Sequence, residues 1–134
     1  MDKKCIKTGD VFHFEKNFEL LNYLFDKDYK GWMKTTYILT ETSFLWMAYI
    51  DGSVRNGWKN EFVESGKLKE SFVGNVLDLP NNIDGSFDYK TRLVFEKRKD
   101  RFIFRGVYKM VEEETKRFSR IYEKIADTTT LFDY

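Results

Sequence analysis

The feature that most constrains the fold is a pair of strand-like runs in the C-terminal half of the chain. Residues 91–96 and 101–110 are rich in β-branched and aromatic side chains, and Lys97-Arg-Lys-Asp100 separates them. Such runs, joined by a few polar residues, predict a β-hairpin with a charged tip. Gly106 interrupts the second run, and a glycine inside a strand often marks a bulge or a close approach to the backbone. In a regular strand, one row of side chains would be Phe102, Phe104, Tyr108 and Met110.

A second hairpin is predicted in the first half of the chain. Residues 34–40 and 44–50 have the composition of strands, and Glu41-Thr-Ser43 separates them. In the second of these runs both alternating rows are apolar, which is typical of a strand in the middle of a sheet. One row is Phe44, Trp46, Ala48 and Ile50, and the other is Leu45, Met47 and Tyr49.

One helix is predicted in the first quarter of the chain, and a segment near the end could form either a second helix or a strand. Apolar residues recur at helical spacing over residues 18–25, directly after Asn17, a favourable N-cap residue. Residues 117–125 also carry apolar residues at helical spacing, although the same stretch could be a final strand. Residues 78–86 are rich in turn formers and predict one long loop. Val11–Phe14 is a short apolar run ahead of the helix, and Asp51–Trp58 reads as an irregular, exposed turn region.

Length and composition indicate a single domain spanning residues 1–134. Cys5 is the only cysteine, so an internal disulfide is impossible and the chain suits a reducing compartment. We find no apolar run of transmembrane length and no signal peptide, and we therefore expect a cytoplasmic protein without a membrane partner. Aromatic residues make up 18% of the chain, which is more than a core of this size requires.

Charge and motifs favour binding over catalysis. Lys and Arg number 23 against 22 Asp and Glu, which leaves room for a local basic patch but not for a uniformly basic surface. His13 is the only histidine, which excludes most triads and zinc sites, and no glycine-rich phosphate loop is present. Asp84, Asp88 and Glu96 could hold a magnesium ion, but such spacings arise by chance in a chain that is 34% charged. We expect no cofactor, no metal and a protein that is not an enzyme.

Two groups of residues are candidates for contact with a ligand. The first consists of basic side chains on and beside the hairpin tip, suited to phosphate contacts: Arg92, Lys97, Arg98, Lys99, Arg101 and Arg105. Alternatively, these residues form a solvated edge that prevents aggregation. The second group combines aromatic rings with amide and carboxylate groups that could stack on a base and read its edge: Trp46, Tyr49, Asp51, Arg55, Trp58 and Asn60. Alternatively, Trp46 belongs to the core and the others to an ordinary loop.

The end of the chain resembles a known family. The runs are Arg92-Leu-Val-Phe-Glu96, Arg101-Phe-Ile-Phe-Arg-Gly-Val-Tyr108 and Arg120-Ile-Tyr-Glu-Lys-Ile125. They resemble the closing strands of PUA-like domains, the group that includes the EVE and SRA-type modules found with bacterial restriction enzymes. The resemblance covers Thr91 to Ala126. It implies a small mixed β-barrel with peripheral helices, a final strand at residues 117–125, and a pocket for a modified or flipped base. It supplies no catalytic residues, because such domains bind while a fused or partner nuclease cuts.

The expected fold is therefore α+β and β-rich, with a small, curved or barrel-like, mostly antiparallel sheet and one or two peripheral helices. The expected function is a nucleic-acid-binding recognition module that reads a modified or flipped base in DNA or RNA. Its partners would be nucleic acid and a protein such as a nuclease. The alternative is a protein-interaction module, for instance an inhibitor or accessory subunit in a defence or counter-defence system. A metal-dependent enzyme is the third hypothesis.

Overall fold

The computed structural model describes residues 4–55, 57–74, 91–116 and 118–131. Within these residues, one α-helix, α1 (Asn17–Phe25), accompanies two sheets, and short 3-10 turns cover Glu64–Gly66 and Glu112–Glu114. The smaller sheet pairs β1 (Lys4–Lys7) with β11 (Thr128–Leu131). The strands of the larger sheet are β2 (Val11–Phe12), β3 (Thr36–Ile38), β4 (Ser43–Ala48), β5 (Val54–Arg55), β6 (Trp58–Val63), β7 (Lys67–Phe72), β8 (Thr91–Lys97), β9 (Phe102–Met110) and β10 (Ser119–Ala126). The loop predicted at residues 78–86 lies outside the described residues.

The larger sheet is mixed and open. Its strand order is β3-β4-β8-β9-β10-β7-β6-β5, with β2 paired to β9. Every pairing is antiparallel except that of β4 with β8, which is parallel. The two ends of this order, β3 and β5, do not pair with each other in the described residues, so the sheet does not close into a barrel. The β-rich, curved architecture is therefore confirmed, whereas the barrel is not.

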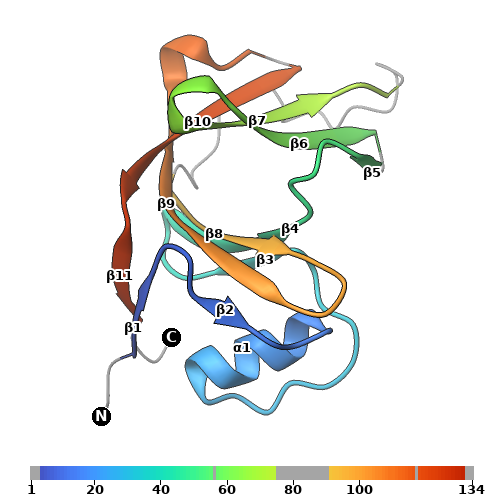
Figure 1. Cartoon of the computed structure of the whole chain (residues 1–134), viewed down its shortest axis with the longest axis vertical. Coiled ribbons are helices and arrows are strands. Elements are labelled where there is room, and N and C mark those ends of the chain that lie inside the picture. Colours follow the sequence, from blue (N-terminus) through green and yellow to red (C-terminus); the bar gives the residue numbers. More distant parts are fainter. Residues whose placement is uncertain (1–3, 56, 75–90, 117, 132–134) are drawn as a thin grey trace.

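The sheet bends so that its two halves face each other (Figure 1). One half contains β3, β4, β8 and β9, and the other contains β10, β7, β6 and β5. The face between the halves, called here the inner face, carries a core built from alternating residues of the strands: Phe44, Trp46, Ala48, Ile50, Leu68, Val94, Tyr108, Met110 and Tyr122. The opposite, outer face of the first half packs against α1, with Leu45, Met47 and Phe95 meeting Leu20 and Leu21. Both faces of β4 are thus buried, as its two apolar rows predict.

A bulge in β9 moves the strand from one core to the other. Gly106 pairs with Val94 and Phe104 pairs with Phe95, so Arg105 is an extra residue in β9. Phe102 and Phe104 consequently lie in the outer core, whereas Tyr108 and Met110 lie in the inner core. The prediction that these four side chains share one face is wrong, because one inserted residue reverses the alternation. The bulge predicted at Gly106 is confirmed.

The other predicted elements are present, but some begin or end at different residues, and one forms a strand where a helix was also considered. Both hairpins form, as β3 with β4 and β8 with β9. The helix begins at Asn17, and Lys16 takes the N-cap position that the sequence analysis gave to Asn17. Residues 119–126 form strand β10 and not the helix that periodicity favours, because Arg120 and Tyr122 alternate onto the inner face between β7 and β9. Strands β5 to β7 and the β1–β11 pair were not predicted.

Candidate nucleic-acid interface

Four of the predicted ligand-contacting residues share the inner face. Trp58 lies opposite Phe72 and Asn60 opposite Glu70 in the β6–β7 pair, and Glu70 lies opposite Arg120 in the β7–β10 pair. In the other half, Trp46 and Arg92 project into the same space from β4 and β8, as shown by the stacking of the Arg92 guanidinium on the Trp46 ring at 4.8 Å. Trp46 is 4% exposed and belongs to the inner core. Trp58 is half-buried at the start of β6 and not in an exposed turn.

The Glu70 carboxylate, whose side chain is 12% exposed, joins the two halves across the inner face. Glu70 Oε1 accepts hydrogen bonds from Arg92 Nη2 at 3.4 Å, Arg120 Nη1 at 3.2 Å and the Tyr122 hydroxyl at 3.4 Å. The Arg92 guanidinium also lies 4.0 Å from the centre of the Tyr122 ring. Its Nε atom is buried and has no hydrogen-bond partner among the described residues. Arg92, predicted as a phosphate contact, is therefore held in the interior by an ion pair and aromatic rings.

Trp58 and Asn60 form the part of the inner face nearest the end of the sheet. The Trp58 ring meets Phe72 edge-on at 5.1 Å, and the Arg120 guanidinium lies 4.9 Å from its centre. Two residues further on, Asn60 Nδ2 donates to the Tyr49 carbonyl at 3.4 Å. Asn60 Oδ1 is buried and has no hydrogen-bond partner among the described residues. A buried acceptor without a partner costs roughly 1–3 kcal/mol, so a donor that reached this oxygen would recover that cost.

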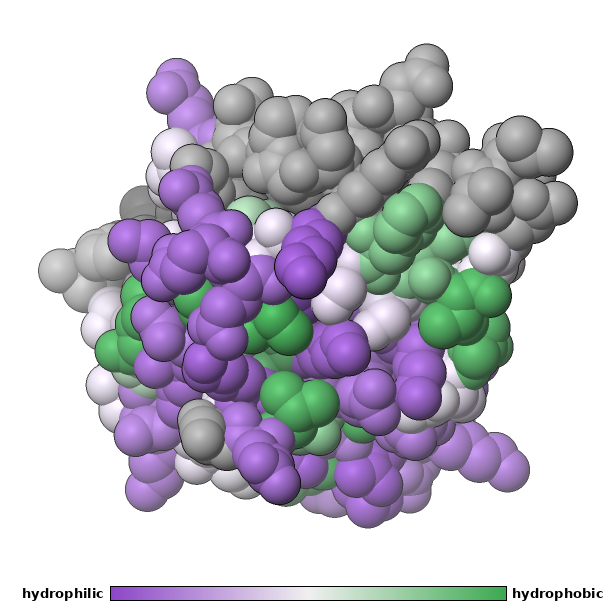
Figure 2. All heavy atoms as spheres, turned by 90° about the horizontal axis from the view of Figure 1, so that it is seen from above, coloured by the Kyte–Doolittle hydropathy of each residue, from purple (hydrophilic) through white to green (hydrophobic). Residues whose placement is uncertain are grey.

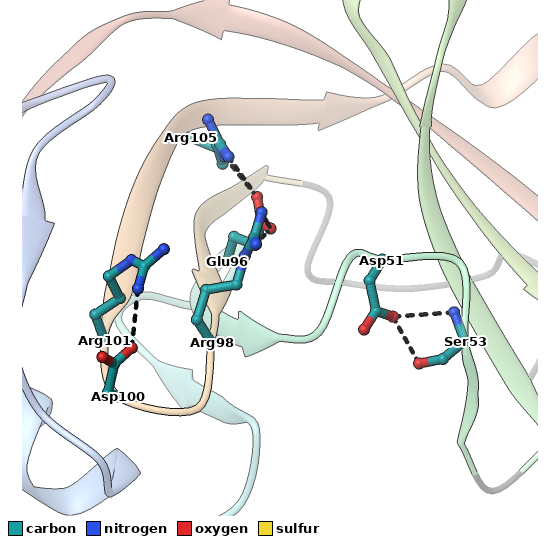
Figure 3. Close-up of polar contacts among 7 residues, drawn as sticks. All are labelled: Asp51, Ser53, Glu96, Arg98, Asp100, Arg101 and Arg105. Carbon is teal, nitrogen blue, oxygen red and sulfur yellow. Dashed lines mark hydrogen bonds and ion pairs between the residues drawn. The ribbon is translucent and has the colours of Figure 1, made fainter.

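Tyr49 lies on the other side of the sheet from Trp46. It follows β4 on the outer row, and the Arg55 guanidinium stacks on its ring at 3.7 Å. Lys97 Nζ is 5.7 Å from the same ring. Asp51 is exposed and accepts hydrogen bonds from the backbone and hydroxyl of Ser53, which lower the pKa of its carboxyl (Figure 3). Of the six residues predicted for one base pocket, Trp46, Trp58 and Asn60 thus lie on the inner face, whereas the Tyr49 ring lies on the outer side.

The basic hairpin tip is largely neutralised by its own carboxylates. Glu96 is 2% exposed, and its two oxygens accept from Arg98 Nε at 2.6 Å and from Arg105 Nε at 2.7 Å (Figure 3). Arg101 Nη1 donates to Asp100 Oδ1 at 2.9 Å. Glu96, also considered as a metal ligand, is therefore engaged in ion pairs, while Asp84 and Asp88 lie outside the described residues. Lys97 and Lys99 border a pocket next to Tyr49 and are the tip cations best placed to meet an anion.

Outside these groups, the described residues form a mostly hydrophilic surface and offer no cluster of metal ligands. Seen from the β10–β5 end, hydrophilic side chains cover most of the described surface and apolar ones lie scattered among them (Figure 2). Within the described residues, no group of three or more His, Cys, Asp or Glu side chains is arranged to hold a metal ion. His13 is exposed between β2 and α1, and Cys5 is an exposed free thiol in β1. In the same part of the chain, no helix combines the length and apolar character needed to cross a bilayer.

Several residues of this interface were missed by the sequence analysis. Trp32 is 87% exposed and borders the pocket together with Lys16, Lys97 and Lys99. The signal that drew attention to Trp58, a tryptophan directly after a glycine, also applies to Gly31-Trp32 and could have found it. Glu70 and Tyr122 carried no such signal, because their importance arises from strands that meet only in the folded chain.

The fold of this chain is similar to that of a known protein. One solved structure similar to the chain is "The 5-Hydroxymethylcytosine-Specific Restriction Enzyme AbaSI", with a TM-score of 0.69 and 14% sequence identity. The match covers 93% of this chain and 42% of that chain, so the protein described here spans less than half of its length. A search among curated proteins finds no match. The open, bent sheet with a helix on its outer face is therefore a fold that this chain shares with part of that structure.

The family follows from the sequence. Residues 1–131 match the family of the SET and RING associated domain, and the chain belongs to that family. The resemblance detected between Thr91 and Ala126 is thus confirmed in kind, but it extends over nearly the whole chain and not only over its C-terminal third. The strands that carried no recognisable motif, β5 to β7 among them, are part of the same module.

Proposed function

We propose that this protein is a DNA-recognition module that binds a modified cytosine turned out of the duplex, with Trp58 and Asn60 as its contacts to the base. Membership of the SET and RING associated domain family supports the ligand class. The solved structure with a similar fold is that of an enzyme specific for 5-hydroxymethylcytosine, which makes this base the first to test. Cleavage would belong to a nuclease partner, as the sequence analysis expects.

The observation that carries this proposal is the unpaired acceptor beside an aromatic ring. Trp58 and Asn60 point to the same side of β6, and Asn60 Oδ1 is buried without a hydrogen-bond partner among the residues that the structure describes. Cytosine presents its exocyclic amine as a donor, and an amide oxygen is a suitable acceptor for it. Enzymes and modules that extrude a base typically read it by stacking and by hydrogen bonds to its Watson–Crick edge. A base stacked on Trp58 would bring its edge towards Asn60.

The test is a binding titration with three matched duplexes that differ at one cytosine, which is unmodified, 5-methylated or 5-hydroxymethylated. We expect tighter binding of a modified duplex by the wild-type protein. Trp58→Ala should weaken that binding by roughly ten- to a hundredfold, because base–aromatic stacking contributes about 1–3 kcal/mol. Asn60→Ala should weaken binding of all three duplexes, because each of them presents the same exocyclic amine of cytosine to this position.

Val63→Ala is the matched control, because Val63 lies on β6 with its side chain on the opposite face from Trp58 and Asn60. It should leave both affinity and preference unchanged. Equal binding of the three duplexes by the wild-type protein would contradict base recognition. Loss of folding in Trp58→Ala, seen by thermal melting, would assign Trp58 to the core, and Asn60→Ala would then carry the test.

A further inference from the structure

A pocket lies beside the outer face, and neither Trp58 nor Asn60 is among the residues that line it. It has a volume of about 560 Å³ and forms where the start of α1, the segment 31–33 and the tip of the β8–β9 hairpin come together. Small-molecule sites commonly have volumes of about 300–1,000 Å³, so the pocket is large enough for an organic ligand. Its lining combines cationic and aromatic side chains, the most relevant being Lys16, Trp32, Tyr49, Lys97 and Lys99.

Asn17 fixes the walls of this pocket. Its side chain is 8% exposed, and its Nδ2 donates to the carbonyl oxygens of Met33 and Lys34, each at 3.3 Å. Its Oδ1 accepts from Lys97 Nζ at 2.9 Å. One buried amide therefore ties the helix start to the segment carrying Trp32 and to the hairpin carrying Lys97. Such bonding holds the pocket open in one arrangement before a ligand arrives.

The pocket carries positive charge without matching counter-charge. Lys16, Lys97 and Lys99 line it, and none of the three ammonium groups forms an ion pair in the described part of the chain. Burial, together with the charges of Lys16 and Arg55, lowers the pKa of Lys97. Glu15 contributes a carboxylate to the same lining. An anion placed among the three lysines would relieve their mutual repulsion, as phosphate does in many basic sites.

Trp32 supplies an unoccupied aromatic surface at this pocket. It is 87% exposed, the highest value among the large hydrophobic side chains described. Phe18 and Tyr49 also line the pocket, but Phe18 is partly buried and the Arg55 guanidinium already stacks on Tyr49 at 3.7 Å. The stacking surface next to the lysines is therefore that of Trp32. An indole beside cations suits a ligand in which a flat ring is joined to an anion.

We propose that this pocket binds a nucleoside phosphate, with the phosphate held by Lys16, Lys97 and Lys99 and the base stacked on Trp32. Two sources have this chemistry: a nucleotide of the bound DNA strand that flanks the recognised base, or a free nucleotide. For the DNA source, the inference rests on the proposed function. For the free nucleotide, it stands without it.

The experiment compares wild type with Trp32→Ala, using the full chain. The probes are the unmodified and 5-hydroxymethylated duplexes and free 2′-deoxyadenosine 5′-monophosphate. If the source is DNA, Trp32→Ala weakens binding of both duplexes by about tenfold, because one stacked base is lost whatever its neighbour. The ratio between the duplexes stays unchanged, because the lost stack does not involve the modified base. If the source is a free nucleotide, the wild-type protein binds the monophosphate saturably and Trp32→Ala does not.

Lysine variants test the phosphate contact. Lys99→Ala should weaken binding of the same probe and reduce its salt dependence by about one phosphate contact. Lys109→Ala is the matched control, because it removes the same charge from an exposed position on β9 that does not line the pocket. Ile38→Ala, at a residue that is 61% exposed in β3, is the control for Trp32.

The outcomes separate this inference from the proposed function. Unchanged duplex binding in Trp32→Ala, together with no binding of the monophosphate by the wild-type protein, overturns the inference even if modified and unmodified duplexes are distinguished. Equal effects of Lys99→Ala and Lys109→Ala overturn the phosphate assignment. Binding of the monophosphate by a protein that binds no duplex supports the pocket and contradicts the proposed function.

Discussion

At the scale of single residues, the pKa of Tyr122 depends on whether the inner core is folded. Its side chain is fully buried, its hydroxyl donates to Glu70, and burial raises its pKa from 10.0 to about 12. A folded-state pKa above the unfolded value means that the native state holds the proton more tightly. The resulting stability is fully present below pH 10 and is lost as the pH rises towards 12.

We therefore expect Tyr122→Phe to change the pH dependence of unfolding. At neutral pH the variant should be less stable by about 1 kcal/mol, because the hydrogen bond to Glu70 is lost. Between pH 10 and about pH 12, wild type should lose up to roughly 3 kcal/mol through this residue, and the variant should not. Urea unfolding across that range measures the difference. Parallel pH profiles for the two proteins would show that Tyr122 ionises normally in the native state.

At the scale of elements, the β9 bulge decides which core each half of the strand enters. Gly106 has φ +122°, a left-handed conformation that favours glycine, and a Cβ there would lie 3.0 Å from the Ala126 carbonyl oxygen. Gly106→Ala should therefore destabilise the protein by roughly 3 kcal/mol. Gly9→Ala is the control, because Gly9 has φ +99° but no atom within 4 Å of a built Cβ, and it should cost roughly 1 kcal/mol. Thermal melts of the two variants compare them, and equal losses would mean that the contact with Ala126 is unimportant.

The elements also show why part of the fold could be predicted from the sequence and part could not. Strands β4, β8 and β9 are predictable because apolar side chains dominate their rows. In β6 and β7 the inner rows contain Asn60 and Glu70, so the alternation of apolar and polar residues is broken. Glu70 can occupy an inner position only because Arg92 and Arg120, from strands distant in sequence, neutralise it there. No local pattern reveals such a partner.

The candidate site was predicted to a similar extent. The residue types were suitable, but Trp46 and Tyr49 alternate to opposite sides of β4 and could not share one pocket. The sequence analysis noted this alternation and still grouped the two residues by their proximity along the chain. Lys97 and Lys99 do border a pocket, but their aromatic neighbour there, Trp32, comes from a segment more than sixty residues earlier in the chain.

At the scale of the whole molecule, the inner face is both a core and the link between the two halves of the sheet. Apolar residues alone would hold the halves together without fixing their relative position. Glu70 on β7 and Arg92 on β8 add a directional contact between them, with side chains that are 12% and 5% exposed. Arg120 on β10 contributes a second guanidinium to the same oxygen.

The last prediction tests that link with a double-mutant cycle. Glu70→Ala leaves the buried guanidinium of Arg92 without its carboxylate and should cost about 3–5 kcal/mol of unfolding free energy. Combining it with Arg92→Met removes the unpaired charge and keeps an apolar side chain of similar length. The loss of unfolding free energy in the double variant should therefore be smaller, by about 1–3 kcal/mol, than the sum of the losses in the two single variants. Glu114→Ala, which breaks the surface pair with Lys67 at 2.8 Å, should cost less than about 1 kcal/mol and serves as the control. Urea unfolding of the five proteins gives the coupling energy. Strict additivity at Glu70 and Arg92 would show that this ion pair adds nothing to the apolar packing and the β9–β10 pairing that already join the two halves.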